Sequence, residues 1–373
     1  MATIPSPLIL PPRTILKRDG ALQLLLECAH FGRRGMLVHG RSLDQSGKLD
    51  AIMKCRTDAE VITYCHSGGE PTLRQLQELL DVARSQQVAW IAGVGGGSVL
   101  DVAKACAGLL YAPEDLESYH DGAAIPESMI PFIAVPTTAG TGSESTIVSV
   151  LTNEKRGVKK SIRHPSFMAR VVILDPELLS GCPSDVIANS GLDAFTQGIE
   201  AYVSNQATWF SDVIALKAVE LVGTSLVAVY KGDNSKQSDL LIGSYLAGAA
   251  LTNARLGLVH GLAHPLGIRY RQPHGRTCAI CLPYIMRFNR ETISWKYNQM
   301  CNVIGDDLEE SIARMTSCFG IRSPFEGQAL SDIDSIIEET LESGSTAANP
   351  RNVEAADVRA ILGQLFSQKS DSM

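Results

Sequence analysis

The sequence predicts a two-domain protein, with an α/β domain built on a parallel sheet over residues 1–182 and an all-α domain over residues 183–373. In the first half, short β-branched runs alternate with helical stretches, a pattern typical of parallel strands joined by crossover helices. After about residue 183, long apolar-periodic stretches dominate and strand signals are few. The length of 373 residues is also sufficient for two domains of ordinary size.

The elements expected in the first half follow one another in a regular order. Each expected strand is a short apolar run, and each expected helix has apolar residues at helical spacing. The strands are expected at 35–40, 60–65, from 88, from 131 and within 169–179, and the helices at 41–56, 72–87 and 99–111. The Asp-Pro pair at 175–176 closes this pattern.

Composition excludes several classes of function. The net charge is −7 and no long basic cluster is present, which argues against nucleic acid or an anionic membrane surface as a partner. The start of the chain lacks a basic region followed by a long apolar one, so no signal peptide is expected. No run approaches ~18 uninterrupted apolar residues, so no transmembrane helix is expected. Nine scattered cysteines indicate reduced thiols. These features favour a soluble cytoplasmic enzyme.

Two glycine-containing turns follow expected strands and could bind a nucleotide. "GVGGGSVLDVAK" (93–104) places Gly96, Gly97 and Ser98 at a helix start, where backbone N–H groups can receive a phosphate. The spacing is not G-x-G-x-x-G, and a plain tight turn is the alternative. "PTTAGTGSE" (136–144) offers hydroxyls of three threonines near the end of another strand, namely Thr137, Thr138 and Thr141. Both loops would meet at the carboxyl edge of a parallel sheet.

The turn after the strand expected at 35–40 bears on which nucleotide binds. An acidic residue in this place usually accepts the ribose 2′-hydroxyl of NAD(H). Here the chain has Gly40, Arg41 and Ser42 and no carboxylate. A guanidinium and a hydroxyl suit a 2′-phosphate, so NADP(H) is favoured over NAD(H). The alternative is that Arg41 is a solvated residue at a helix start.

Three of the eight histidines lie together in "GLVHGLAHPLGIRYRQPHG" (257–275). His260 and His264 are four residues apart, a spacing that can place two metal-binding imidazoles on one helix face. The alternative is a face with one core-packed and one exposed imidazole. Asp193 and Gln197 have the same spacing in an earlier helical stretch. The residues alone therefore suggest a metal site without deciding its ligands.

Taken together, the motifs resemble those of the iron-containing (group III) alcohol dehydrogenases. The resemblance extends over essentially the whole chain and rests on "GGGSVLDVAK", "PTTAGTGSE", "LDAFTQGIEAYVS", "GLVHGLAHPLG", "PHGRTCAICLPYIMRFN" and "NPRN". It implies a dehydroquinate synthase-like fold, with a dinucleotide-binding domain and a helical metal and substrate domain. It also implies NAD(P) and one divalent metal, usually Fe²⁺ and sometimes Zn²⁺, in a cleft between the domains. The family commonly dimerises through an N-terminal strand, matched here by "RTILKR".

The resemblance also assigns roles to individual residues of the first domain. It places the pyrophosphate on Gly96, Gly97 and Ser98, and the phosphates and ribose against the threonine loop. Asp101 would lie on the nicotinamide side, although a helix-start carboxylate favoured by the helix dipole is the alternative. Lys159 would lie near the ribose, with the neighbouring Lys160 leaving the register open by one residue.

In the second domain the resemblance gives four metal positions, Asp193, Gln197, His260 and His274. His264 becomes a pocket residue that relays a proton or lines the substrate site. Gln197 departs from the family, which has histidine there. An amide oxygen is a weaker, neutral ligand, but three protein ligands suffice for a catalytic zinc. We therefore expect the metal to bind with lower affinity or altered selectivity. The alternative is that the metal is lost and Gln197 contacts the substrate.

The expected function is a metal-dependent, NAD(P)-linked alcohol dehydrogenase or aldehyde reductase that acts on a small-molecule substrate. A metal-free reductase of the maleylacetate-reductase kind, a dehydroquinate synthase-like lyase and an inactive nucleotide-binding protein are the alternatives. Cys278 and Cys281 form a C-x-x-C, which could be a redox or zinc site, but the apolar run "CAICLPYIM" favours two packed core thiols. Four arginines could select an anionic aldehyde or lie on the surface, namely Arg255, Arg269, Arg271 and Arg276.

Overall fold

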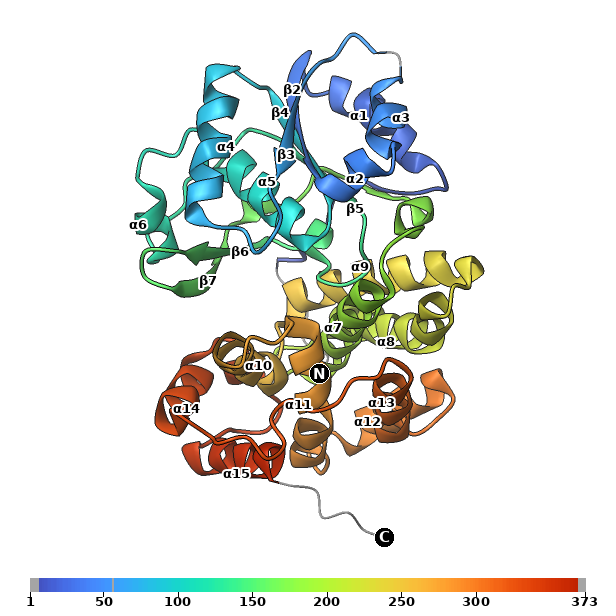
Figure 1. Ribbon diagram of the computed structural model, residues 1–373, viewed down its shortest axis with the longest axis vertical. Coiled ribbons are helices and arrows are strands. Elements are labelled where there is room, and N and C mark those ends of the chain that lie inside the picture. Colours follow the sequence, from blue (N-terminus) through green and yellow to red (C-terminus); the bar gives the residue numbers. More distant parts are fainter. Residues whose placement is uncertain (1–6, 56, 368–373) are drawn as a thin grey trace. The chain divides into compact units, whose positions relative to one another are not determined.

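A computed structural model describes residues 7–55 and 57–367 of the chain. The chain divides into two compact units, Ile9–Cys182 and a second unit that combines residues 7–8 with the chain from Pro183 onward. The first unit combines a sheet with helices, and the second is built from α-helices (Figure 1). This is the predicted fold class.

The first unit is organised around a six-stranded parallel sheet with the strand order β1-β8-β5-β4-β2-β3. These strands are β1 Thr14–Leu16, β2 Arg34–Gly40, β3 Glu60–His66, β4 Trp90–Gly95, β5 Phe132–Pro136 and β8 Val171–Leu174. Every residue of β4, β5 and β8 is buried. Strands covered on both faces are apolar throughout, which is why these three are uninterrupted apolar runs in the sequence.

Helices and short 3₁₀ turns connect these strands. The α-helices are α1 Leu24–Ala29, α2 Arg41–Gln45, α3 Lys48–Met53, α4 Leu73–Ser85, α5 Gly97–Leu109 and α6 Leu116–His120, and the 3₁₀ turns are η1 Gly20–Gln23, η2 Ser143–Ser145, η3 Pro165–Phe167 and η4 Pro176–Leu179. The single helix expected over 41–56 is wrong, because the chain forms α2 and α3 instead. Gly47 separates them with a φ of 70°, a left-handed conformation that glycine adopts readily and that ends a helix.

An antiparallel hairpin that the sequence reading did not predict follows β5. It consists of β6 Val148–Asn153 and β7 Val158–Arg163. The side chain of Asn153 accepts hydrogen bonds from the backbone N–H groups of Lys155 and Arg156, a turn in which an amide side chain substitutes for backbone. Gly157 completes the turn with a φ of 65°.

The strand order creates a switch point between β2 and β4. From β2 the chain crosses to β3 on one side, and it then returns to β4 on the other side of β2. His39 of β2 pairs with Val94 of β4, and Gly95 pairs with Pro136 of β5. The turns that follow β2, β4 and β5 therefore lie side by side at one edge of the sheet. Ligands of open α/β sheets bind at such a switch point.

The second unit is organised around α7, which is buried along most of its length. Its α-helices are α7 Ser184–Val203, α8 Trp209–Tyr230, α9 Gln237–Ala254, α10 Leu258–Arg269, α11 His274–Asn289, α12 Ser294–Ile304, α13 Leu308–Cys318, α14 Ile333–Glu342 and α15 Ala355–Phe366, with the 3₁₀ turns η5 Asn234–Lys236 and η6 Thr346–Ala348. Helices α8, α9 and α11 pack against α7. Gly191 permits the approach of α8, because a Cβ there would lie 2.1 Å from a methyl carbon of Leu226.

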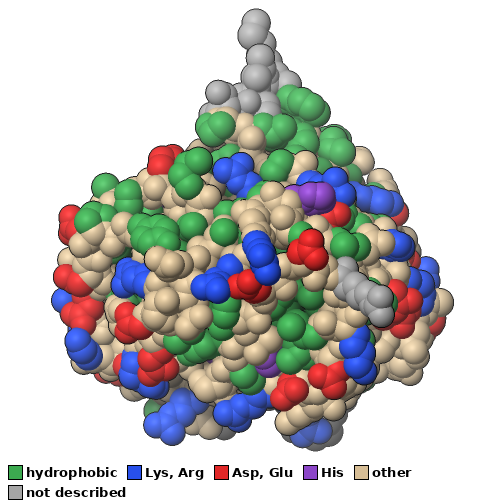
Figure 2. All heavy atoms as spheres, turned by 90° about the horizontal axis from the view of Figure 1, so that it is seen from above, with side chains coloured by type: hydrophobic (Ala, Val, Ile, Leu, Met, Phe, Trp, Pro, Cys, Tyr) green, Lys and Arg blue, Asp and Glu red, His purple; other side chains and the backbone are tan. Residues whose placement is uncertain are grey.

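Helix α8 is the one described helix that is long and apolar enough to cross a membrane by composition. It packs between α7, α9 and α12, which is the behaviour of a core helix in a helical unit. On the face drawn in Figure 2, acidic and basic side chains are interspersed, and no basic stretch stands out among the coloured residues.

Candidate functional site

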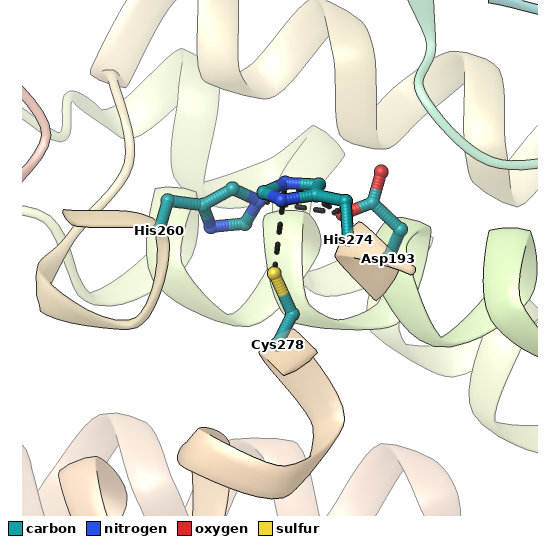
Figure 3. A group of neighbouring side chains, drawn as sticks. All are labelled: Asp193, His260, His274 and Cys278. Atoms are coloured by element: carbon teal, nitrogen blue, oxygen red, sulfur yellow. Dashed lines mark hydrogen bonds and ion pairs between the residues drawn. The ribbon is translucent and has the colours of Figure 1, made fainter. Parts of the chain in front are cut away.

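Four side chains of the second unit converge on one point. They are Asp193 of α7, His260 of α10, and His274 and Cys278 of α11, and their potential ligand atoms all lie within 4.8 Å of one another. Asp193 Oδ1 is 3.5 Å from His260 Nε2 and 3.6 Å from His274 Nε2. Figure 3 shows the two imidazoles side by side, with the Cys278 sulfur pointing at His274. The structure thus brings together Asp193, His260 and His274 and adds a thiol, and the fourth predicted metal position, Gln197, contacts Asp193.

Helix α7 contributes a polar face to this otherwise apolar core. Asp193, Gln197 and Glu200 are spaced i, i+4 and i+7, which aligns them on one side of a helix. All three side chains are buried. Buried carboxylates and amides require partners, so the contacts of each one indicate what it does.

Glu200 fixes the orientation of His260. Its carboxylate lies 2.5 Å from Nδ1 of His260 and also accepts the backbone N–H groups of Val259 and His260 at 2.6 and 3.4 Å. A carboxylate at a helix start is favoured by the helix dipole. Because Nδ1 is engaged by Glu200, Nε2 of His260 faces Asp193. A carboxylate behind a histidine is the usual second partner of a metal-binding imidazole.

Sequence reasoning missed both Glu200 and its neighbour Asn349. The Asn349 side chain exchanges two hydrogen bonds with Asn289, at 2.8 and 3.0 Å, and also accepts the N–H of Leu258. It therefore links the start of α10 to the end of α11. The spacing from Asp193 to Glu200 could have pointed to Glu200, whereas nothing in "NPRN" indicates what Asn349 contacts.

His274 is placed by the packing of α11 onto α7. It is the first residue of α11 and is about one-third exposed at its side chain. The next residue, Gly275, lies so close to α7 that a Cβ would be 1.9 Å from the backbone oxygen of Asn189. Only glycine permits this approach. The distance between His274 and Asp193 therefore depends on a glycine contact.

Gln197 turns its amide toward Asp193. Its Nε2 donates to Asp193 Oδ2 at 3.0 Å. Its Oε1 is buried and has no hydrogen-bond partner among the described residues. The amide therefore orients the carboxylate and leaves one acceptor available.

The donor set fits a divalent metal ion. Asp193 Oδ1 and His260 Nε2 are also buried without a hydrogen-bond partner in the described part of the chain. Buried polar atoms without partners are rare in proteins and call for an explanation such as an ion. Carboxylate oxygen and imidazole nitrogen are ligands of both iron and zinc.

The pKa values of the converging side chains reflect their contacts with one another. Burial alone raises the pKa of Asp193, but the charges of His274 and His260 outweigh it and the pKa is lowered. Burial likewise raises the pKa of Cys278, and the same two histidines outweigh it and lower the pKa. For Cys281, three residues later, burial dominates and the pKa is raised well above the usual value. The two thiols of the C-x-x-C therefore have different surroundings.

His264 lies at the edge of the group. Its ring stacks on that of His274, with centroids 4.8 Å apart and an interplanar angle of 26°, and its side chain is partly exposed. It therefore contacts a candidate ligand while lying nearer the surface than Asp193 and His260. This placement is compatible with a pocket residue.

The predicted nucleotide loops lie together in the first unit. Gly96 caps the start of α5 and Gly97 is its first residue. A Cβ on Gly96 would be 3.2 Å from the Thr138 hydroxyl, and one on Gly97 would be 2.7 Å from the Thr141 methyl. The glycine turn and the threonine loop are therefore in contact across a cradle that side chains would fill. The backbone N–H groups of Gly97 and Ser98 belong to the helix start, a common anion site.

The neighbouring turn after β2 carries Gly40, Arg41 and Ser42. Gly40 caps α2 with extended backbone, and Arg41 and Ser42 begin that helix with exposed side chains. No ion pair or hydrogen bond holds the Arg41 guanidinium among the described residues. It is therefore available to an anionic ligand at the switch point.

Asp101 belongs to α5, and its place on the nicotinamide side stays a prediction. Its carboxylate accepts from the Ser143 hydroxyl at 2.5 Å and from the Val150 N–H at 3.0 Å. Lys104, one turn later, is fully buried and donates to three backbone oxygens and one hydroxyl between residues 143 and 148. Together they tie α5 to the segment that carries the threonine loop.

Lys159 projects from β7 and forms an ion pair with Glu70, with 2.5 Å between Nζ and Oε1. Lys160 pairs instead with Asp121 at 3.6 Å. The two lysines alternate along the strand and so lie on opposite faces. The charge of Lys159 acts to lower the pKa of Asp101, against the larger effect of burial, which raises it. Of the arginines, Arg269 is held by Glu339 of α14.

Two family models match the chain. The model of iron-containing alcohol dehydrogenases matches residues 11–176. The model of the C-terminal region of the Fe-containing alcohol dehydrogenase family matches residues 187–366.

Individual proteins with related names are similar to this chain over most of its length. The lactaldehyde reductase of Escherichia coli strain K12 is 30% identical over 345 residues, which cover 87% of this chain and 90% of that protein. The NADPH-dependent butanol dehydrogenase of Clostridium saccharobutylicum is 29% identical over 376 residues, which cover 94% and 96%. A crystal structure of a 1,3-propanediol oxidoreductase has a TM-score of 0.89 at 28% identity and covers 98% of this chain and 100% of its own.

Proposed function

The chain belongs to the iron-containing alcohol dehydrogenase family, and on that premise we propose that it is a metal-dependent reductase of small aldehydes that prefers NADP(H). The reverse reaction is the oxidation of the corresponding alcohol. The observation that carries the proposal is the convergence of Asp193, His260 and His274, with buried ligand atoms that lack partners. Relatives named as a lactaldehyde reductase and an NADPH-dependent butanol dehydrogenase support a small substrate of this class.

We assign the metal to Asp193, His260 and His274. A divalent ion bound there, Fe²⁺ or Zn²⁺, would supply Lewis acidity toward the substrate oxygen. Glu200 holds His260 in the tautomer that presents Nε2. Gln197 holds Asp193 so that Oδ1 faces the two rings. His264 is the candidate group that exchanges a proton with the substrate oxygen.

We assign the nucleotide to the switch point of the sheet. The glycine turn and the threonine loop would hold the pyrophosphate and ribose, and the exposed Arg41 and Ser42 would hold the 2′-phosphate. Arg41→Asp places a carboxylate where NAD(H) enzymes have one. We expect this variant to raise KM for NADPH strongly and to lower KM for NADH. An unchanged ratio of kcat/KM for the two nucleotides would rule out this assignment.

The proposed function is tested by metal analysis combined with turnover. Protein purified without chelators should contain close to one divalent ion per chain and oxidise NADPH with small aldehydes. His274→Ala should lose metal and turnover together, while secondary structure measured by circular dichroism stays unchanged. Full turnover of a metal-free His274→Ala protein would contradict the metal mechanism.

A metal-free reductase is the second candidate, and the Gln197 amide is the observation that favours it. In that case Gln197 Oε1 would accept a hydrogen bond from the substrate. The two candidates differ under chelation, because the metal-dependent enzyme loses activity on dialysis against a chelator and regains it with added ion. A metal-free reductase would keep its activity throughout.

We also propose a homodimer that forms through β1. This strand is an edge of the described sheet and pairs on one side with β8. An edge strand offers backbone groups to a second copy. Light scattering of the purified protein should give twice the chain mass, and a Leu16→Pro variant, which lacks one of these N–H groups, should weaken the dimer.

A further inference from the structure

We propose that Cys278 is the fourth protein ligand of the metal, in place of the Gln197 amide, and that the resulting Asp–His–His–Cys site selects zinc over iron. The inference rests on the proposed function, because it assumes that Asp193, His260 and His274 hold an ion. It adds a residue whose apolar sequence context had favoured core packing.

The position of Cys278 in α11 brings its sulfur to the group. It lies one helical turn after His274, so the two side chains share a helix face. Its Sγ is 3.6 Å from His274 Nε2 and the residue is fully buried. In Figure 3 the sulfur points from α11 toward the imidazole of His274.

Three of the distances between ligand atoms are close to those around a tetrahedral ion. Zinc bonds of about 2.0–2.1 Å to nitrogen and oxygen and about 2.3 Å to sulfur, at the tetrahedral angle, place N and O ~3.3 Å apart and N and S ~3.6 Å apart. The observed separations are 3.5 and 3.6 Å from Asp193 Oδ1 to the two histidines. The separation from His274 Nε2 to the Cys278 sulfur is 3.6 Å. All four ligand atoms lie within 4.8 Å of one another, so the group closes around an ion by adjustment of its side chains.

Chemistry favours the thiol over the amide as the fourth ligand. Gln197 is already engaged through Nε2, which donates to Asp193 Oδ2, and its oxygen is neutral. A thiolate carries a charge and is the softer donor, a type that selects zinc among the available divalent ions. With Asp193 it gives two negative charges against the two positive charges of the ion. Gln197 is then a positioning residue that orients Asp193.

Binding converts the Cys278 thiol to a thiolate and releases its proton to solvent, as metal binding to cysteine does generally. Four protein ligands are compatible with a catalytic role, since zinc expands to five-coordination during reaction. Cys278 on α11 thus supplies the ligand that the family has as histidine at position 197 on α7.

Cys281 is a matched control in the same helix. It is also fully buried, three residues after Cys278, but it is outside the group of ligand atoms. Removing either sulfur with alanine deletes the same atom from an equally buried place. A difference between the two variants therefore reports on metal ligation and not on core packing.

The decisive experiment is cobalt substitution of the full-length protein. Co²⁺ bound to a thiolate gives a near-ultraviolet sulfur-to-metal charge-transfer band, which nitrogen and oxygen ligands do not give. We expect the band in the parent and in Cys281→Ala, and its loss in Cys278→Ala and Cys278→Ser. The affinity for Zn²⁺ should fall about 100-fold in both Cys278 variants, because each variant loses the contribution of one of four ligands to the binding free energy. Under an equimolar mixture of Fe²⁺ and Zn²⁺ without oxygen, the parent should take up zinc and Cys278→Ser should take up a larger share of iron.

Two further outcomes separate this inference from the proposed function. A parent that binds one Co²⁺ without the band, and whose Cys278 variants bind Zn²⁺ with parental affinity, would overturn the thiolate ligand and leave the metal site intact. An Asp193→Ala variant that still binds metal like the parent would overturn the site itself. Gln197→His in the Cys278→Ser background should restore zinc affinity without restoring the band. Failure of that rescue, with the charge-transfer band absent from the parent, would place the fourth ligand elsewhere.

Discussion

The contact between Gly275 and α7 gives a prediction whose size can be derived from the structure. A Cβ added at Gly275 would lie 1.9 Å from the backbone oxygen of Asn189, and real Cβ atoms essentially never approach closer than 3.0 Å. The start of α11 in Gly275→Ala must therefore move by at least about 1.1 Å, the difference between these values. The obstacle is backbone of a buried helix, which cannot turn aside as a side chain can.

This displacement acts directly on His274, the preceding residue. Metal sites accept deviations of about 0.2 Å in their bond lengths, and a misplacement of about 1 Å at a reacting centre costs about 100-fold. We expect the affinity of Gly275→Ala for Zn²⁺ to fall about 100-fold, with a loss of turnover at limiting metal. Competition with a chromophoric chelator measures the affinity, and circular dichroism checks that the helices remain.

Gly267→Ala in α10 is the matched control. A Cβ there would lie 3.4 Å from the backbone oxygen of Gln272, which is an ordinary contact, so its metal affinity should equal that of the parent. Parental affinity in Gly275→Ala as well would refute the reasoning, because α11 would then be able to shift without moving its imidazole.

Three other residues give further predictions. Glu200→Gln removes the charge behind His260 and should lower Zn²⁺ affinity 10- to 100-fold; an unchanged affinity would mean that Glu200 serves only the start of α10. Lys104→Met leaves four buried acceptors and a carboxylate without their cation and should destabilise the first unit by about 3–5 kcal/mol, measured by urea unfolding; a shift below 1 kcal/mol would contradict it. Burial raises the pKa of Glu144 from 4.5 to about 7, so its contribution to stability is full below pH 4.5 and is lost as pH rises through 7. Glu144→Gln should therefore stabilise the protein relative to the parent by about 2–3 kcal/mol more at pH 8 than at pH 5, and an equal difference at both pH values would exclude this titration.

The architecture could be predicted because its signals are local. Buried parallel strands are apolar throughout, and the helices of the second unit have apolar residues at helical spacing. Both kinds of element can therefore be predicted from the order of apolar and polar residues. The break between α2 and α3 was missed because one glycine, Gly47, decided it against an otherwise helical pattern. The β6–β7 hairpin was missed because its strands carry lysines and serines, and the Asn153 turn was not identified.

The site was only partly predictable, for a physical reason. Asp193, His260 and His274 belong to motifs that are informative by residue type and order. Cys278 lies in an apolar run, and burial is common to a packed thiol and to a ligand thiol. Its distance of one helical turn from His274 was the available signal. The bonds from Glu200 to the start of α10 and from Asn349 to Asn289 join residues 59 or more positions apart, and sequence spacing carries no information about such contacts.

The candidate metal ligands and the nucleotide loops belong to different units of the fold, and this has a consequence for thermal unfolding. All four candidate metal ligands belong to the unit that begins at Pro183, and all the nucleotide loops belong to Ile9–Cys182. A ligand stabilises the folded state to which it binds in proportion to the logarithm of its concentration. If the two units melt in separate steps, a calorimetric scan should show one peak that moves with zinc and another that moves with the nucleotide. Each ligand would then report on the folding of its own half of the chain.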